Sequence, residues 1–239
     1  MISTPDPARW VLWCDPDLLV LNKPAGLPTL PDGYHAEAPH VKSVLEPLYG
    51  RLWIVHRLDK ETSGVLVLAR HAAAHRNLNT QFEQHTIEKI YHALVRGEAA
   101  WETTSVRLPL RADGDRRHRT VVDAQQGKPA ITHLCVLQRF AGWTWLEARP
   151  ETGRTHQIRA HLYALGLPLA GDALYGGKEN LFPINSSGVP LMARQCLHAR
   201  HLALNHPMTS ARVTFTAPYP DDLQGMLDDF TQLIGEAAQ

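Results

Sequence analysis

One stretch of the chain places an acid between bases and hydroxyl groups, and it is the first candidate for chemistry. It reads His56-Arg57-Leu58-Asp59-Lys60-Glu61-Thr62-Ser63-Gly64 and lies between two apolar runs, residues 52–55 and 65–69, which predict buried strands. A carboxylate near a core is tolerated when a cation and hydrogen bonds stabilise its charged form, so Asp59 is a candidate nucleophile or base. The plainer alternative is that Asp59 only caps a turn between two strands.

A second stretch offers a candidate cation. Residues 152–162 begin as a glycine turn and continue as a predicted helix, with Thr155 as its N-cap and Gly166 as its end. Arg154 then lies where a strand meets a helix, a position that can project a guanidinium into a cleft. The alternative is that Arg154 is an ordinary surface cation.

Two further segments carry candidate binding residues. Residues 88–97 alternate like a strand and contain Tyr91, which either has a role in a site or only contributes the strand propensity of tyrosine. Residues 107–119 are rich in arginine, and this clearly basic segment is either a solvated turn around Asp113-Gly114-Asp115 or a surface for a polyanion.

The remaining pattern predicts the elements that position these residues. We expect a hairpin from residues 10–14 and 18–21, helices over 41–49 and 71–85, and a hairpin from 130–140 and 143–149 turned at Ala141-Gly142. A strand over 212–217 and an amphipathic terminal helix through Leu223, Leu227, Phe230 and Ile234 follow, and residues 176–188 read as a polar loop. Hairpins interrupted by a few helices favour the α+β class.

These motifs together resemble the RluA-type family of RNA pseudouridine synthases. The likeness rests on His-Arg-Leu-Asp-x-x-Thr-Ser-Gly, on Lys89-x-Tyr91-x-Ala93-x-x-x-Gly97, and on Gly-Arg-Thr-His-Gln-Ile-Arg-x-His. Shorter matches occur at Asn-Lys-Pro-x-Gly (residues 22–26), at residues 171–176 and at residues 197–207, so the resemblance covers the chain from about Asn22 to Pro207 in order. Lys23, in the first of these, is as compatible with a structural role as with a substrate contact.

The resemblance implies roles for single residues. Asp59 would be the catalytic nucleophile, Arg154 its salt-bridge partner, and Tyr91 the ring that stacks on the target base. Arg57 would fill the stack that the extruded uridine leaves, and Ile158 would line the pocket. The implied enzyme is an isomerase that converts specific uridines in structured tRNA or rRNA to pseudouridine, with RNA as its partner and no cofactor or metal.

The fold implied by the resemblance is the pseudouridine synthase fold, a mixed and mainly antiparallel sheet flanked by helices with a central active-site cleft. About ten residues precede the first predicted strand, so we expect one catalytic domain over residues 1–239, without an N-terminal domain of the ribosomal S4 type, and a monomer.

Composition places limits on these expectations. The net charge is zero and the pI is about 7.3, so the positive charge that RNA binding requires must be concentrated locally. Of the 24 basic residues 18 are arginine, the side chain best suited to phosphate and base contacts. We therefore expect the basic segment to contact RNA through Arg111, Arg116, Arg117 and Arg119.

The cysteines and the apolar runs bear on the compartment. Cys14, Cys135 and Cys196 are odd in number and widely spaced, and no apolar run has the length of a signal peptide or a membrane span, so we expect a cytoplasmic protein. A competing hypothesis is a metal-dependent hydrolase or nuclease that uses His198, His201, His206 and Asp172. This hypothesis is disfavoured because residues 202–204 alternate like a strand, and His198 and His201 would share one face only on a helix.

A second competing hypothesis is a non-catalytic RNA-binding module, which does not require Asp59 and Arg154 together.

Overall fold

The computed structural model describes residues 6–31, 37–176 and 192–237. These residues form two compact units: one comprises residues Met1–Lys89 and Ala199–Pro218, the other Ile90–His198 and Tyr219–Gln239. We call them unit 1 and unit 2, and the division falls within two strands, β5 (Glu88–Arg96) and β11 (Leu197–Asn205). The predicted loop over residues 176–188 lies, apart from Gly176, outside the described residues.

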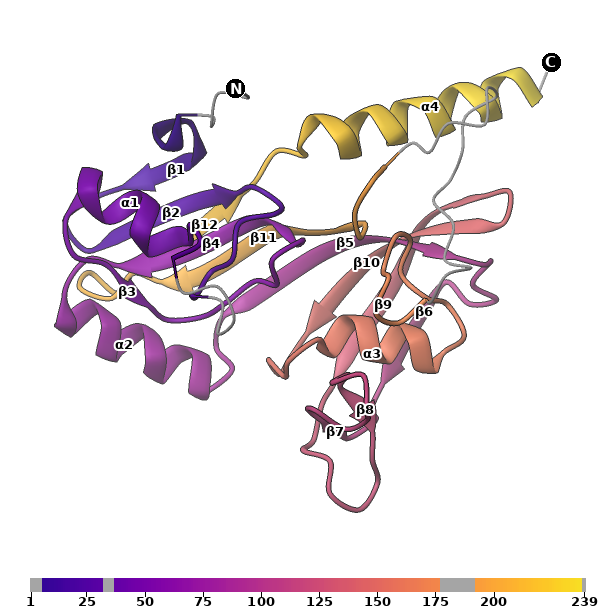
Figure 1. The fold of residues 1–239 in the computed structure, drawn as a ribbon, viewed down its shortest axis with the longest axis horizontal. Helices are drawn as coiled ribbons and strands as arrows, with labels where there is room; N and C mark the ends of the chain where they lie inside the picture. Colours follow the sequence, from indigo (N-terminus) through magenta and orange to yellow (C-terminus); the bar gives the residue numbers. More distant parts are fainter. Residues whose placement is uncertain (1–5, 32–36, 177–191, 238–239) are drawn as a thin grey trace. The chain divides into compact units, whose positions relative to one another are not determined.

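Unit 1 is built around a buried antiparallel ribbon. Its elements are the 3-10 helix η1 (Pro7–Trp10), β1 (Val11–Cys14), β2 (Leu18–Lys23), α1 (Val41–Tyr49), β3 (Trp53–Ile54), β4 (Ser63–Ala69), α2 (Ala72–Glu83) and β12 (Arg212–Thr216). β4 is buried along its whole length, pairs antiparallel with β2 and β3, and packs against α2 (Figure 1). One core cluster joins Val65 and Val67 of β4 to Leu78 of α2.

Unit 2 is a sheet with a helix on each face. Its elements are β6 (Thr103–Val106), β7 (Leu110–Arg111), β8 (Val121–Val122), β9 (Thr132–Phe140), β10 (Trp143–Pro150), α3 (Gln157–Ala164) and α4 (Asp221–Ala237). Leu146 and Ala148 of β10 share a core cluster with Ile158 of α3, whereas Trp145 shares another with Phe230 of α4. Consecutive side chains along β10 therefore point to opposite faces of the sheet, one covered by α3 and the other by α4.

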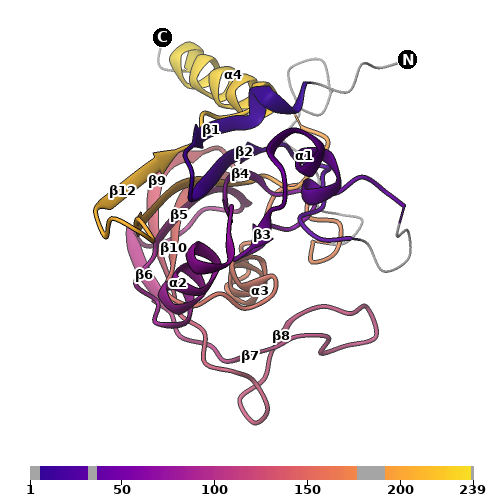
Figure 2. The same cartoon turned by 90° about the vertical axis from the view of Figure 1, so that its left-hand side faces the viewer.

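A small hairpin completes unit 2. β7 and β8 pair antiparallel and form a separate two-stranded sheet that contacts α3, and both views show it beside that helix (Figures 1 and 2). The basic segment predicted as a loop thus includes one strand of a short hairpin, while Asp113-Gly114-Asp115 stays in the turn between the strands.

Most predicted elements are confirmed, and two details were wrong. The strand predicted over residues 52–55 is reduced to Trp53–Ile54, because the side chain of His56 accepts the Val67 N–H at 2.9 Å, next to the last β3–β4 pair. The N-cap predicted at Thr155 is His156 instead, in the left-handed region and without a side-chain cap bond. Every strand pair described within the units is antiparallel, which confirms an α+β fold with a mainly antiparallel sheet.

Candidate active site

Asp59 lies in the loop between β3 and β4, and two anchors hold this loop on either side of Arg57. The first is His56, whose ring stacks on Phe82 at 4.7 Å and whose Nε2 accepts the backbone N–H of β4. The second is Leu58, whose N–H and carbonyl both bond to the hydroxyl of Thr29, at 3.2 and 2.9 Å. Thr29 is thus a positioning residue that no sequence motif indicated.

Lys23 supplies a third anchor and resolves the question that the sequence left open. Its side chain is fully buried, and its ammonium donates to the carbonyls of Pro24, Leu27 and Lys60, at 2.7, 2.8 and 3.2 Å. A second donor, the Gly26 N–H, reaches the Lys60 carbonyl at 2.9 Å. Three carbonyl acceptors compensate the loss of water around the charge, so Lys23 is structural and joins the proline-rich loop to the Asp59 loop.

These anchors determine which side chains of the loop reach solvent. His56 and Leu58 turn inward, which leaves Arg57 exposed and Asp59 half-buried. The Asp59 carbonyl accepts the Thr62 N–H at 3.1 Å, which closes a turn before β4 begins. A carboxylate on so restrained a backbone loses little conformational entropy when it meets a substrate, which favours catalysis.

In unit 2, Gln157 organises the turn that carries Arg154. Its side-chain oxygen accepts from the Arg154 N–H at 3.0 Å and from the Thr152 hydroxyl at 2.7 Å, while its amide donates to Ile131 and Thr132. The Arg154 Nε donates to a backbone carbonyl at 3.1 Å, and the side chain is only partly exposed. Gln157 belongs to the recognised motif, but its positioning role was not predicted.

Tyr91 and Ile158 lie in the same part of unit 2. Tyr91 is on β5, pairs with Ala148 of β10, and packs against the core cluster that contains Ile158 of α3. Ile158 is buried in that cluster, at 6% exposure, and its role as a pocket wall stays a prediction. Asp59 and Arg57 belong to unit 1, whereas Tyr91, Arg154 and Ile158 belong to unit 2. The pairing of Asp59 with Arg154 therefore stays a prediction.

A buried ion pair joins the first half of α3 to the turn that follows residue 171. The guanidinium of Arg159 makes a bidentate contact with Asp172, at 2.6 and 2.9 Å, and both side chains are buried. One oxygen of Asp172 also accepts the N–H groups of Leu174 and Tyr175, at 3.1 and 3.2 Å. The carboxylate is thus saturated with donors, which fixes the turn that follows residue 171.

The arginines of the β7–β8 hairpin fall into two classes. Arg111 and Arg119 are ion-paired with Asp123 and Asp115, with Nε to carboxylate distances of 2.6 and 2.7 Å. The hydrogen bond from Arg119 lowers the pKa of Asp115. A neighbouring carboxylate therefore compensates each of these two charges.

Arg116 and Arg117 differ from that pair. Both are exposed in the turn of the hairpin, and Arg117 donates through Nη2 to the carbonyl of Ala173 at 3.1 Å. Among the described residues, neither makes an ion pair with a carboxylate. These two arginines are the better candidates for phosphate contacts.

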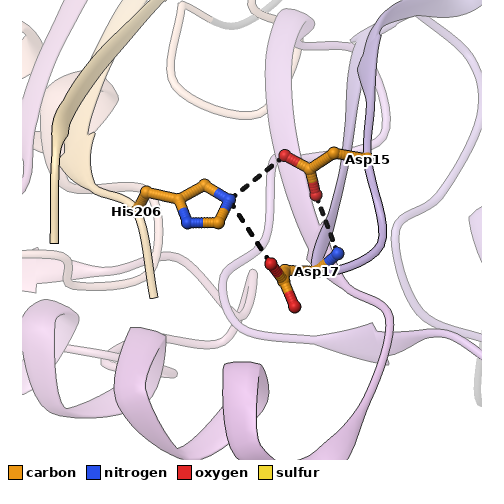
Figure 3. Close-up of side chains that lie close together, drawn as sticks. All are labelled: Asp15, Asp17 and His206. Carbon is orange, nitrogen blue, oxygen red and sulfur yellow. Dashed lines mark hydrogen bonds and ion pairs between the residues drawn. The ribbon is translucent and has the colours of Figure 1, made fainter. Parts of the chain in front are cut away.

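The residues of the competing metal-site hypothesis are engaged elsewhere. His198 and His201 lie three positions apart on β11, which directs them to opposite faces of the strand, and Asp172 is clamped by Arg159. His206 instead lies with Asp15 and Asp17, at 3.1 and 3.7 Å from Nε2 to the carboxylates (Figure 3). In the described part of the chain this is the one group of side chains spaced to hold a metal ion.

The hydrogen bonds of that group favour a structural role without a metal. Nδ1 of His206 accepts the N–H groups of Met208 and Thr209, at 3.4 and 3.3 Å, so the proton of the neutral ring is on Nε2 and points at the carboxylates. Burial opposes ionisation of Asp15, but hydrogen bonds from Trp13, two backbone N–H groups and His206 outweigh it and lower its pKa. The cluster ties the β1–β2 turn to the β11–β12 turn.

A comparison with protein-family models identifies the family of the chain. The chain matches the model of one family, described as RNA pseudouridylate synthase, over residues 17–164. That span is more than half of the chain and includes Asp59, Tyr91 and Arg154. The chain belongs to the RNA pseudouridylate synthases. The family expected from the sequence motifs is confirmed, and its members are isomerases of uridine in RNA.

Relatives and solved structures agree with the family. A ribosomal large subunit pseudouridine synthase D of Pseudomonas aeruginosa is 37% identical over 91% of this chain and 70% of its own length. A protein of the same name from Neisseria meningitidis is 36% identical over 93% of this chain, but only 62% of that relative is covered. The human RNA pseudouridylate synthase domain containing 4 has a TM-score of 0.76 and 26% identity, with 94% of each chain covered. The pseudouridine synthase fold is thereby confirmed.

No helix in the described ranges is both long and apolar enough to cross a membrane.

Proposed function

We propose that this chain converts uridine to pseudouridine in large-subunit ribosomal RNA, with Asp59 as the nucleophile. The observation that carries the proposal is the Asp59 loop itself, in which Lys23, Thr29 and His56 hold the backbone while the carboxylate stays half-buried. The choice of ribosomal over transfer RNA rests on the names of the relatives from Pseudomonas aeruginosa and Neisseria meningitidis.

The reaction breaks the bond between uracil N1 and ribose C1′ and forms a bond from C5 to C1′. C5 loses its proton, N1 gains one, and no electrons are exchanged. In the proposed mechanism Asp59 acts as an ionised carboxylate against the sugar or the base, and Arg154 keeps it charged and directs it. These steps demand no redox cofactor and no metal.

The target uridine must leave the RNA stack to reach this carboxylate, at a cost of a few kcal/mol. We propose that Arg57, exposed beside the nucleophile, fills the vacated position. Tyr91 would stack on the extruded base, with Ile158 behind it in the same core cluster. Tyr91→Phe keeps the ring, so a loss of turnover as large as that of Asp59→Asn would assign its hydroxyl a part in proton transfer at C5.

Release of tritium from uridine labelled at C5, within ribosomal RNA, tests the proposal. Wild type should release tritium with and without a metal chelator, and Asp59→Asn should reduce release to background while it still binds RNA. Release by Asp59→Asn would refute the nucleophile. A chelator-sensitive activity restored by zinc would instead favour the hydrolase, and RNA binding without any release would favour a non-catalytic module. Transfer RNA labelled in the same way tests the substrate class.

We further propose that the β7–β8 hairpin binds RNA phosphates. With Arg111 and Arg119 ion-paired, most of the effect should come from Arg116 and Arg117. Each phosphate contact contributes about 0.7 to the slope of log affinity against log salt on single strands, so replacing both by Gln should reduce the slope by about 1.4. Filter binding across a salt series measures it, and an unchanged slope would make the hairpin a solvated surface.

The proposed compartment is the cytoplasm, with which the free thiols of Cys14, Cys135 and Cys196 are compatible. The proposed oligomeric state is a monomer, which light scattering tests.

A further inference from the structure

Tyr163, on the last turn of α3, is an exposed aromatic residue that the reaction does not use. The residues of α3 that face the sheet are Ile158 and Leu162, whereas the side of the helix with Tyr163 faces the β7–β8 hairpin. Its side chain is 47% exposed, in a helix whose other residues from 157 to 162 are all buried. An exposed ring beside basic side chains is the arrangement with which proteins bind unpaired bases.

The ring is the outer member of an alternating series of guanidinium groups and aromatic rings. Arg159 lies 5.1 Å from the centre of the Tyr175 ring, and Arg119 lies 5.9 Å from the same ring. Arg119 is in turn 5.4 Å from the centre of the Tyr163 ring. Arg159, Tyr175 and Arg119 are buried or half-buried, so the series begins in the core of unit 2 and ends on its surface.

Each inner member of the series is fixed by further bonds. Arg159 is clamped by Asp172, as described above, and the Tyr175 hydroxyl donates to the Thr120 carbonyl and accepts the Thr120 N–H, at 3.1 and 3.0 Å. Hydrogen bonds to Asp115 and Tyr163 raise the pKa of Arg119, so that its charge is permanent. Tyr163 therefore packs on a rigid support, and the protein loses little conformational entropy when a base stacks on the ring.

Positive charge lies along the same segment. Arg116 and Arg117 precede Arg119 in the hairpin turn, and Arg117 bonds to Ala173, two residues before Tyr175. The carboxylates of this turn are occupied, because Asp115 pairs with Arg119 and Asp113 pairs with His118. A ring for a base, in contact with a hairpin turn that also carries two exposed guanidinium groups for phosphates, fits a nucleotide better than an acidic or apolar peptide.

We propose that Tyr163 is a stacking platform for one unpaired base of the RNA substrate, outside the reacting uridine. Arg116 and Arg117 bind the flanking phosphates. The platform is tolerant of base identity, since every base has a face to stack. This inference rests on the proposed function only in that it takes RNA as the substrate.

Binding of a fluorescent oligoadenylate, measured by anisotropy, tests the platform without engaging a uridine site. Tyr163→Leu keeps an apolar side chain against Tyr175 but removes the aromatic face, and it should raise the Kd for oligoadenylate about 5- to 100-fold. Tyr163→Phe should keep the Kd of wild type within about 2-fold, since the ring remains. The salt dependence of binding should be that of wild type in both variants, because neither changes a charge.

A matched control is Leu165→Ala, which removes another exposed apolar side chain from the same end of α3 and should leave the Kd unaltered. An unaltered Kd in Tyr163→Leu would overturn the platform, as would an equal loss in Tyr163→Phe, which would assign the effect to the hydroxyl. Limited proteolysis of the β7–β8 hairpin is compared between wild type and Tyr163→Leu. Equal cleavage rates show that the substitution lowers the affinity without displacing the hairpin. Unequal rates would overturn the assignment of the effect to stacking. Tritium release by wild type on uridine RNA is followed in parallel. Its absence refutes the proposed function, whereas release with unaltered oligoadenylate binding in Tyr163→Leu refutes the platform alone.

Discussion

His56 should make the fold sensitive to acid, and the structure gives the size of the effect. The imidazole stacks on Phe82 at 4.7 Å, accepts the Val67 N–H at 2.9 Å, and has the Lys89 ammonium nearby. Burial, with a smaller contribution from Lys89, lowers the pKa of His56 from 6.5 to about 3. A protonated ring would also lose its role as acceptor, and the N–H of β4 would be left without that partner.

The direction follows from which state binds the proton. Above about pH 6.5 the ring is neutral in the folded and the unfolded chain and contributes no pH dependence. Below that value the unfolded chain takes up a proton that the folded protein rejects until about pH 3, so stability falls as the pH falls. At about 1.4 kcal/mol per pH unit, the free energy of unfolding should lose roughly 2 kcal/mol between about pH 7.5 and pH 5 from this residue alone.

Urea unfolding, followed by tryptophan fluorescence over that pH range, measures the loss. The test variant is His56→Gln, whose amide oxygen can accept the same N–H but does not titrate. It should lack roughly 2 kcal/mol of the pH dependence of wild type, whatever its stability near neutral pH. The matched control is His75→Gln on α2, whose ring bonds to Asn79 and not to the backbone of β4, and the loss of pH dependence should be specific to His56→Gln. Parallel curves for wild type and His56→Gln would refute the reasoning.

Three further predictions concern other positions. Arg154→Lys should lower kcat about 30- to 150-fold, because an ammonium cannot make the bidentate contact expected with the nucleophile, and a near wild-type rate in the tritium assay would show that the pairing is wrong. Gly64→Ala should cost at least about 2 kcal/mol in urea unfolding, since φ is +113° and a Cβ would lie 2.2 Å from a carbonyl oxygen of β11. Gly142→Ala, with φ +76° and open space around it, should cost only about 1 kcal/mol, and equal costs would contradict the steric argument. Asp172→Asn should destabilise the protein by about 3 to 5 kcal/mol because it leaves the buried Arg159 without its counter-charge, and a urea midpoint like that of wild type would count against this account.

Local sequence pattern was enough for most elements of the fold. The short helix expected over residues 41–49, with Gly50 as its end, is α1 with the observed bounds, and the turn at Ala141-Gly142 predicted the β9–β10 hairpin. The pattern failed where a side chain took over a backbone bond. His56 accepts the N–H of Val67, and β3 ends early. At α3 the Gln157 N–H, which a Thr155 hydroxyl would have to accept, bonds to the Arg154 carbonyl, and the N-cap is His156. Propensity does not predict such bonds, because the His56 bond depends on the neighbouring strand and the Gln157 side chain is held by Ile131 and Thr132 of the adjacent segment.

The same distinction holds for the candidate site. The sequence by itself indicated the family and the fold class, and its motifs, through their resemblance to that family, selected Asp59, Tyr91 and Arg154 as candidates. Only the tertiary structure decided that Lys23 is a buried structural cation held by three carbonyls. It alone separated the paired Arg119 from the exposed Arg116 and placed Tyr163 at the end of a supported stack. Charge compensation, burial and stacking are properties of neighbours brought together from distant parts of the chain, and a linear pattern does not contain them.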